Sequence, residues 1–222
     1  MEQLLAQRKS VHDMTAEEIE QLQALHDSFR PRWITPTVQV GPLMPSDRDD
    51  LLKYLNDPRI VNTLVGPPKP YLPEHADGWI RTRIERLSLK GSPLECAIRD
   101  MEKGGKLIGA VRVSDGPDDQ LEGDDVGYWL AAEYHGQGLM AKALKLMLQD
   151  ISIKEAGKRK FNAHAHIGNW ASRRTLEKAG FVYLSEVHLH GLQIWRFRQY
   201  LTEEDLAVRE VAVEAVPLPS LS

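Results

Sequence analysis

The stretch from Asp125 to Phe181, DVGYWLAAEYHGQGLMAKALKLMLQDISIKEAGKRKFNAHAHIGNWASRRTLEKAGF, decides how this chain folds. It begins with an apolar strand pattern, Val126 to Leu130, and continues through the turn His135 to Gly138 into an amphipathic helix. Glycines between a strand and a helix leave bare backbone N–H groups at the positive end of the helix dipole. The turn is therefore predicted to bind an anion, although two glycines alone can also make only a tight turn.

Two common phosphate-binding motifs are missing from this turn. It lacks the G-x-G-x-x-G spacing of dinucleotide-binding folds and the Lys-Ser or Lys-Thr pair of P-loops. The second half of the stretch is more specific. A further strand pattern, Lys160 to Ala165, is followed by Asn169-Trp170-Ala171-Ser172 and then by Leu176 to Phe181.

Together these motifs resemble the GNAT superfamily of acyl-CoA N-acyltransferases. They are most similar to the subgroup that includes the ribosomal-protein N-terminal alanine acetyltransferases. That subgroup carries a Gly-Tyr-Trp-Leu-like strand, an Arg-Gly-x-Gly turn and an Asn-x-x-Ser…Glu-Lys-x-Gly-Phe segment. The matching residues here are Gly127 to Leu130, His135 to Gly138 and Asn169 to Phe181. The resemblance implies an α+β (mixed α/β) fold, with a mostly antiparallel central sheet of six to seven strands flanked by helices. It also implies that the fourth and fifth strands splay apart.

Composition narrows the class of protein. The 222 residues suit one domain with an extension. The net charge is −4 with interspersed signs, so no nucleic-acid partner is expected. No apolar run is long enough to span a membrane, and the polar N-terminus does not read as a signal peptide. The single cysteine, Cys96, allows no internal disulfide, and a cytoplasmic location is expected.

Three segments are expected along the chain: a helical extension at 1–34, the GNAT domain at 35–205 and a tail at 206–222. In the extension, Thr15 and Glu18 form a capping box, and Pro31 ends the helix. The apolar stripe of this helix needs a cover. Either the domain's own surface or a second copy of the chain, as a homodimer, can supply it.

Alternating and helical patterns place the remaining elements. Seven strands are expected, at residues 38–43, 94–99, 107–113, 126–130, 161–166, 181–188 and 193–201. Ser46 is expected to cap a short helix, Pro73 to begin a longer one, and Asn169 to cap a helix that ends at Gly180. A short terminal helix is expected at 202–209, and residues 57–72, rich in proline, are expected to form a loop.

The resemblance implies acetyl-CoA as co-substrate. Main-chain amides from Gly136 to Ala141 would meet its pyrophosphate, and its pantetheine arm would pair with the splayed strand near Leu130 as an added strand. One N–H in this region would bond the thioester oxygen. The cofactor-binding residues that the resemblance implies are Trp129, Leu130, Ala131, His135, Gly136, Gln137, Gly138, Leu139, Met140, Ala141, Asn169 and Ser172. His135 and Met140 depart from the family pattern, which has Arg or Gln and a small residue at these positions.

The attacking amine must be neutral. Deprotonating a lysine-like amine at pH 7 costs roughly 4.6 kcal/mol, and an α-amine about 1.4 kcal/mol. Asp125 is the candidate for the catalytic proton path, because it matches the strand position where some family members carry a basic glutamate. The alternative is that Asp125 is only a carboxylate at the start of a strand.

The group that protonates the leaving thiolate has a different candidate here from that in many family members. Many family members use a tyrosine seven residues after the asparagine, where this chain has Leu176. Ser172 matches the serine proposed for this role in the resembled subgroup. The alternative is that its hydroxyl only satisfies backbone amides in the first turn of a helix.

Tyr71, Trp79 and His164 are the candidates for lining the site of the acceptor amine. In the resembled family the region around Tyr71 and Trp79 forms one wall of the acceptor site, although aromatic residues at helical spacing are more often core. His164 and His166 share a strand face and can line the same site; no third ligand is signalled, so no metal is expected. Loops 57–72 and 185–192 are expected to select the acceptor.

The sequence therefore predicts an N-acetyltransferase that transfers acetyl from acetyl-CoA directly to the primary amine of a small molecule or a peptide N-terminus. Three alternatives remain open at this point. They are a protein N-terminal alanine acetyltransferase, a non-catalytic acyl-CoA-binding module, and a regulatory protein that binds a partner through the N-terminal helix.

Overall fold

A computed structural model describes residues 15–17, 20, 24, 32–64, 66–90, 95–113, 123–154, 158–189 and 191–202. The predicted N-terminal helix falls largely outside these residues. So does the helix predicted at 202–209.

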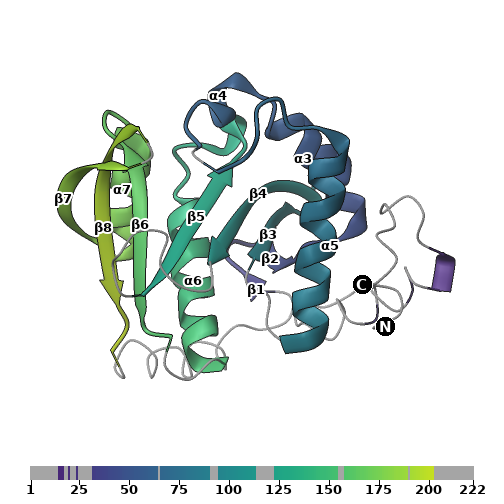
Figure 1. Cartoon of the computed structure of the whole chain (residues 1–222). Coiled ribbons are helices and arrows are strands. Elements are labelled where there is room, and N and C mark those ends of the chain that lie inside the picture. The colour runs from purple at the N-terminus through teal and green to yellow at the C-terminus, as the bar shows by residue number, and fades with distance from the viewer. Residues whose placement is uncertain are drawn as a thin grey trace.

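A single mixed sheet of eight strands forms the centre of the fold (Figure 1), in the order β1-β2-β3-β4-β5-β6-β8-β7. The strands are β1 (Arg32–Trp33), β2 (Val38–Pro42), β3 (Glu95–Asp100), β4 (Lys106–Val113), β5 (Asp124–Leu130), β6 (Lys160–His166), β7 (Val182–Leu189) and β8 (Leu192–Tyr200). Seven of them correspond to the predicted strands. The eighth, β1, pairs antiparallel with β2, so the sheet already begins inside the segment expected to be an extension.

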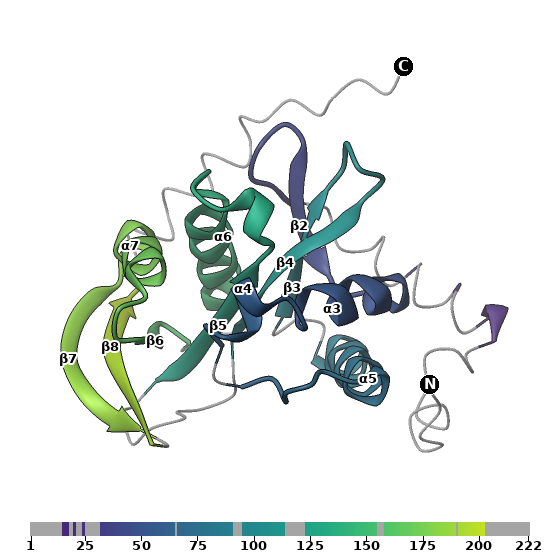
Figure 2. The same ribbon diagram turned by 90° about the horizontal axis from the view of Figure 1, so that it is seen from above.

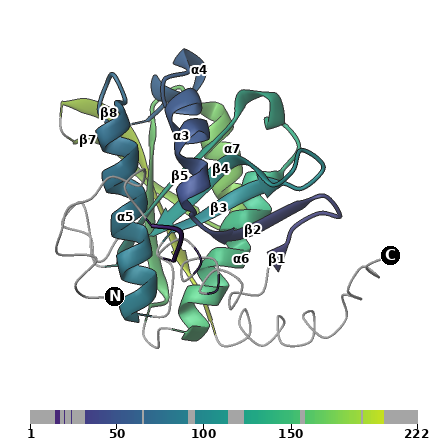
Figure 3. The same ribbon diagram turned by 90° about the vertical axis from the view of Figure 1, so that its right-hand side faces the viewer.

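Helices cover both faces of the sheet. They are the short 3-10 turns η2 (Pro45–Asp47) and η3 (Ala132–Tyr134) and the α-helices α3 (Arg48–Tyr54), α4 (Pro58–Val61), α5 (Pro73–Lys90), α6 (Leu139–Lys154) and α7 (Trp170–Ala179). Figures 2 and 3 show α3 and α5 on one face and α6 on the other. Helix α7 packs against α6, β6 and β7. The predicted α+β class is confirmed.

Two local expectations in the first half of the chain are wrong. Ser46 does not cap a helix, because it lies inside η2, and the Met44 N–H instead bonds Asp47 Oδ2 at 2.7 Å. The stretch 57–72 is not loop throughout, because Asp57 caps the one-turn helix α4 by accepting from the Arg59 N–H at 2.9 Å. Pro73 does begin α5 as predicted.

The packing of β4 against β5 depends on Gly109. A Cβ at this position would lie 2.7 Å from the Trp129 carbonyl oxygen and 2.9 Å from Leu130 Cδ1, closer than side-chain atoms pack. The neighbouring residues Leu107, Ile108 and Val111 are fully buried. A larger residue at 109 would therefore push β5 away from β4.

The predicted splay lies between β5 and β6. These strands are parallel and pair only from Asp124↔Phe161 to Val126↔Ala163, although β5 continues to Leu130 and β6 to His166. Figure 1 shows the two strands together at their lower ends and diverging upward. Every other strand pair in the sheet is antiparallel. The β5–α6–β6 crossover therefore produces both the parallel pair and the opening beside it.

Candidate active site

A cavity of about 710 Å³ occupies the opening between β5 and β6. Its walls come from α4, α5, the strands β3 to β6, α7 and β8. Ten of the predicted site residues line it: Tyr71, Trp79, Asp125, Trp129, Leu130, His135, Met140, His164, Asn169 and Ser172. The other six are Ala131, Gly136, Gln137, Gly138, Leu139 and Ala141. Five of these form the turn between His135 and Met140 and the first residues of α6, at the edge of the cavity.

The glycine turn presents bare main chain. Gly136 and Gly138 have φ values of 79° and 72°, a conformation that favours glycine, and a Cβ built on either meets nothing within 4 Å. Helix α6 begins directly afterwards at Leu139, and the first N–H groups of a helix have no partner within it. These amides and the open space before them fit a phosphate group.

At the exposed edge of β5, two of the three residues expected to pair with pantetheine do not turn their backbone groups to the opening. The Ala131 N–H bonds the Ile108 carbonyl at 2.7 Å and its carbonyl accepts from the Tyr134 N–H at 2.9 Å, so Ala131 has no free backbone group to offer. Backbone groups alternate in direction along an antiparallel strand, so those of Trp129 also face β4. The groups that face the splay belong to Tyr128 and Leu130.

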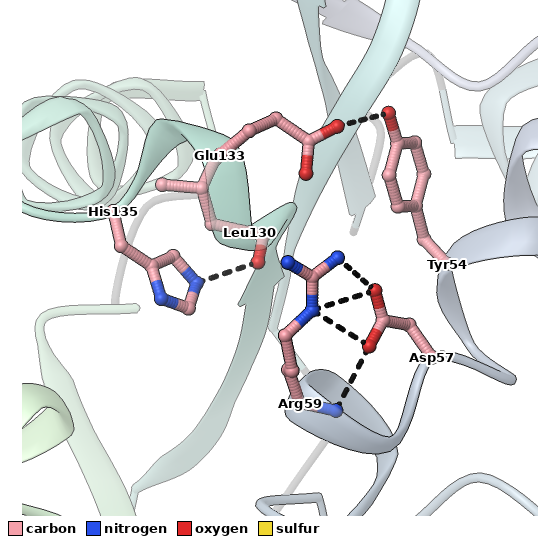
Figure 4. Close-up of polar contacts among 6 residues, drawn as sticks. All are labelled: Tyr54, Asp57, Arg59, Leu130, Glu133 and His135. Atoms are coloured by element: carbon pink, nitrogen blue, oxygen red, sulfur yellow. Dashed lines mark hydrogen bonds and ion pairs between the residues drawn. The ribbon is translucent and has the colours of Figure 1, made fainter.

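The His135 side chain covers one of these groups. Its Nε2 lies 2.8 Å from the Leu130 carbonyl oxygen (Figure 4). A pantetheine amide that bonds this carbonyl must displace the imidazole or use the second lone pair of the oxygen. His135 therefore meets the cavity through its ring, which the sequence analysis did not anticipate.

Polar contacts of α3 and α4 lie beside the cavity (Figure 4). Tyr54 of α3 donates to Glu133 of η3 at 3.0 Å, and Arg59 of α4 pairs with Asp57 at 2.6 Å. The hydrogen bonds from Arg59 hold the pKa of the Asp57 carboxyl at about 2. Arg59 also lines the cavity, and the ionised Asp57 beside it balances its charge.

Ser172 is held from two sides. The Asn169 side-chain oxygen accepts from the Ser172 N–H at 3.1 Å, which makes the predicted cap of α7, and Gly180 ends this helix in the left-handed conformation. The Ser172 hydroxyl lies 2.7 Å from the Tyr128 hydroxyl. Burial raises the pKa of Tyr128 far above its ordinary value, so Tyr128 stays protonated. Sequence reasoning placed Tyr128 in a motif but gave it no role.

Asp125 and His164 lie together in the cavity wall. His164 Nδ1 is 3.7 Å from Asp125 Oδ1, and Asp125 is 4% exposed. They come from neighbouring strands next to the point where β5 and β6 separate. The arrangement places a carboxylate and an imidazole within reach of the same ligand.

A cluster of charged residues that the sequence analysis missed lies beneath α5. The carboxylate of Glu95 accepts from Trp79 Nε1 at 3.0 Å and from Arg83 Nε at 2.9 Å. Burial raises the pKa of Glu95, and the charge of Arg83 opposes that rise. Arg112 also lines the cavity beside it. The available signal was a charged residue between apolar neighbours in each strand, Leu94-Glu95-Cys96 and Val111-Arg112-Val113.

Two kinds of feature are absent from the residues that the structure describes. None of the helices there is both long and apolar enough to cross a bilayer. In the same part of the chain, no three His, Cys, Asp or Glu side chains come together as a metal site would require.

Solved structures share this architecture. The ribosomal-protein-S5-alanine acetyltransferase from Vibrio fischeri has 20% identity and a TM-score of 0.62, over 79% of this chain and 98% of its own. RimL, a ribosomal L7/L12 α-N-protein acetyltransferase in complex with coenzyme A, has 16% identity and a TM-score of 0.64, over 80% and 99%. The aminoglycoside enzyme AAC(6')-Ib, with paromomycin and acetyl-CoA, has 17% identity and a TM-score of 0.56, over 77% and 96%. At these identities the likeness shows the fold.

Sequence comparison identifies the family. A search of curated proteins finds no match. Residues 38–182, well over half of the chain, match the family model described as an acetyltransferase (GNAT) domain. The chain therefore belongs to the GNAT acetyltransferases, acyltransferases that use acetyl-CoA.

Proposed function

We propose that this protein transfers an acetyl group from acetyl-CoA directly to the primary amine of a small molecule or a peptide N-terminus. The observation that carries the proposal is that one cavity joins the free edge of β5 to Asp125, on one side, and to Ser172, on the other. The cavity thus places a carboxylate for the amine and a hydroxyl for the sulfur beside the same strand, β5.

The coenzyme is held by main chain in this proposal. The amides from Gly136 to Ala141 bind its diphosphate, and the backbone of Tyr128 and Leu130 pairs with its pantetheine arm. Acetyl-CoA supplies the thioester carbon that the amine attacks. The turn and the strand edge fix where this carbon lies along β5.

Asp125 handles the amine proton. Holding a peptide N-terminal amine neutral at pH 7 costs only about 1.4 kcal/mol and a lysine-like amine roughly 4.6 kcal/mol, so a carboxylate in contact with the amine helps more as the amine becomes more basic. His164 lies close enough to orient Asp125, directly or through a water. As the nitrogen–carbon bond forms, the amine proton passes to Asp125.

Ser172 handles the sulfur. When the carbon–sulfur bond breaks, the electron pair stays on sulfur, and the Ser172 hydroxyl donates a hydrogen bond to it. Tyr128 positions this hydroxyl and, because its pKa is raised by burial, does not itself give up a proton. Ser172 thus acts in place of the tyrosine that is replaced by Leu176.

Binding of acetyl-CoA tests the pocket. Gly138→Trp should abolish binding, measured by calorimetry, because the indole would project into the open space at the turn. Gly104→Trp is the matched control: Gly104, in the β3–β4 turn, has a φ of 71° against 72° for Gly138 and equally open surroundings. Normal affinity in Gly138→Trp would refute the assigned pocket.

Turnover tests the chemistry. Release of the coenzyme thiol in the presence of short peptides and of small amines should exceed the blank. Binding of acetyl-CoA without transfer to any amine would instead indicate a non-catalytic acyl-CoA-binding module. Transfer to peptides alone would indicate a protein N-terminal acetyltransferase.

A further inference from the structure

Arg112 presents a guanidinium with no committed partner to the cavity. It lies opposite Gly127 in the β4–β5 ladder and folds across it: a Cβ on Gly127 would lie 3.7 Å from Arg112 Nε and 3.9 Å from Nη2. The Trp79 ring, 5.7 Å from the guanidinium carbon, flanks it. Because Gly127 has no side chain, the guanidinium reaches the strand that carries Asp125.

Other arginines around the core have carboxylate partners. Arg83 bonds Glu95 at 2.9 Å, Arg48 bonds Asp77 at 2.7 Å, and Arg99 is paired with Asp47. In the described part of the chain, no side-chain hydrogen bond or ion pair involves the Arg112 guanidinium, although its charge acts on Glu95. An arginine whose neighbouring carboxylate is already hydrogen-bonded to other side chains is suited to an anion from the ligand.

Glu95 is the carboxylate beside Arg112, and it is already engaged. One of its oxygens accepts from Trp79 and the other from Arg83, and Glu95 is only 3% exposed. With Arg83 and Arg112 both charged, this group of three is positive overall whether or not Glu95 is ionised. The charge faces the cavity through Arg112 and not through Arg83.

Tyr71 supplies a second donor in the same part of the cavity. Its side chain lines the cavity and is 4% exposed, and within the described part of the chain its hydroxyl has no hydrogen-bond partner. Burial and the nearby charge of Glu95 raise the pKa of Tyr71, so the hydroxyl keeps its proton. A buried hydroxyl without a partner is costly, and an acceptor atom from a ligand would remove that cost.

We propose that the acceptor is a free amino acid, whose α-carboxylate is bound by Arg112 and Tyr71 while its amine faces Asp125. The proposal rests on the proposed function. Asp125 and Gly127 lie on one face of β5, two residues and so about 6.7 Å apart. A carboxylate and an amine on the same carbon, with a hydrogen bond at each end, span that separation. A peptide N-terminus offers a neutral carbonyl there, and a simple alkylamine offers nothing.

The test compares matched acceptors with the full chain and acetyl-CoA. The twenty protein amino acids are assayed, and each one that is acetylated is compared with its carboxamide and its decarboxylated amine. The carboxamide has the less basic amine, so intrinsic reactivity at pH 7 favours it over the acid. We expect kcat/KM to be at least about tenfold higher for the acid, as a charged hydrogen-bonded pair provides.

Variants then test which residues cause the preference for the acid over the amide. Arg112→Met should bring the acid-to-amide ratio to within about threefold of one, and Arg112→Lys should keep part of it. Tyr71→Phe should lower the ratio, and Arg174→Met, on the exposed side of α7, should leave it unchanged. Acetyl-CoA affinity should be unaffected in all four.

Several results would overturn the proposal. If the wild-type protein acetylates amides or peptides with the same kcat/KM as the acids, the proposal is refuted, whether or not the variants fold. An acid preference that persists in Arg112→Met would also refute it. Failure of the proposed function looks different, because then no amine of any kind is acetylated or acetyl-CoA does not bind.

Discussion

At the scale of single residues, the proposed chemistry depends most on the hydroxyl pair of Tyr128 and Ser172. The two residues are 44 positions apart in sequence, and their oxygens lie 2.7 Å apart. Tyr128 stays neutral because burial raises its pKa, so in the proposed mechanism it orients Ser172. A residue that acts through Ser172 and a residue that contacts the substrate directly give different patterns in a double-mutant cycle.

Tyr128→Phe should lower kcat about three- to tenfold, the effect of one lost hydrogen bond, and Ser172→Ala about a hundredfold. The double variant should be no slower than Ser172→Ala, because the tyrosine acts through the serine. Steady-state kinetics of the four proteins measures this, with the dissociation constant of acetyl-CoA as the control. Additive losses in kcat would show that Tyr128 acts on the substrate by itself.

At the scale of elements, η3 sets the position of the glycine turn. The Tyr134 hydroxyl donates to Asp100 Oδ2 at 2.6 Å and accepts from Lys103 Nζ at 2.7 Å, which ties η3 to the end of β3. The hydrogen bond from Tyr134 lowers the pKa of the buried Asp100 carboxyl. A group whose pKa is lower in the folded state stabilises the fold above its unfolded pKa and loses that effect as the pH falls.

Tyr134→Phe should therefore destabilise the fold by about 1–2 kcal/mol at pH 7, and the difference from wild type should shrink as the pH falls below about 4. Denaturant unfolding at several pH values measures this. Lys103→Met is the control, since Lys103 is exposed and its loss should destabilise the fold less than Tyr134→Phe does. A difference that stays constant down to pH 2 would contradict the assignment to Asp100.

Elements with local signals were predictable from sequence, and those fixed by distant contacts were not. Asn169 and Gly180 mark the two ends of α7 within a dozen residues, so both were identified. The two-residue strand β1 exists only because β2 lies beside it, and its sequence carries no repeat that a pattern could reveal. Likewise the bonding of Ala131 to Ile108 follows from the register of two strands, which side-chain patterns do not report.

At the scale of the whole molecule, the sheet consists of two parts. Strands β1 to β5 form one and β6 to β8 the other, joined in the sheet by three residue pairs between β5 and β6. Helices α6 and α7 pack together across the junction. A ligand that pairs with the free edge of β5 would fill the opening and hold the two parts in place.

Hydrogen exchange resolved by residue can detect that pairing. On addition of acetyl-CoA at about 100 times its Kd, the amides of Tyr128 and Leu130 should exchange up to about a hundredfold more slowly where exchange requires the ligand to leave. Those of Trp129 and Ala131 should change little, because they face β4 in either state. Protection that instead falls on Trp129 and Ala131, or on neither pair, would mean that the coenzyme does not add to β5 as a strand, since the alternation of the ladder permits only one pair to face the opening.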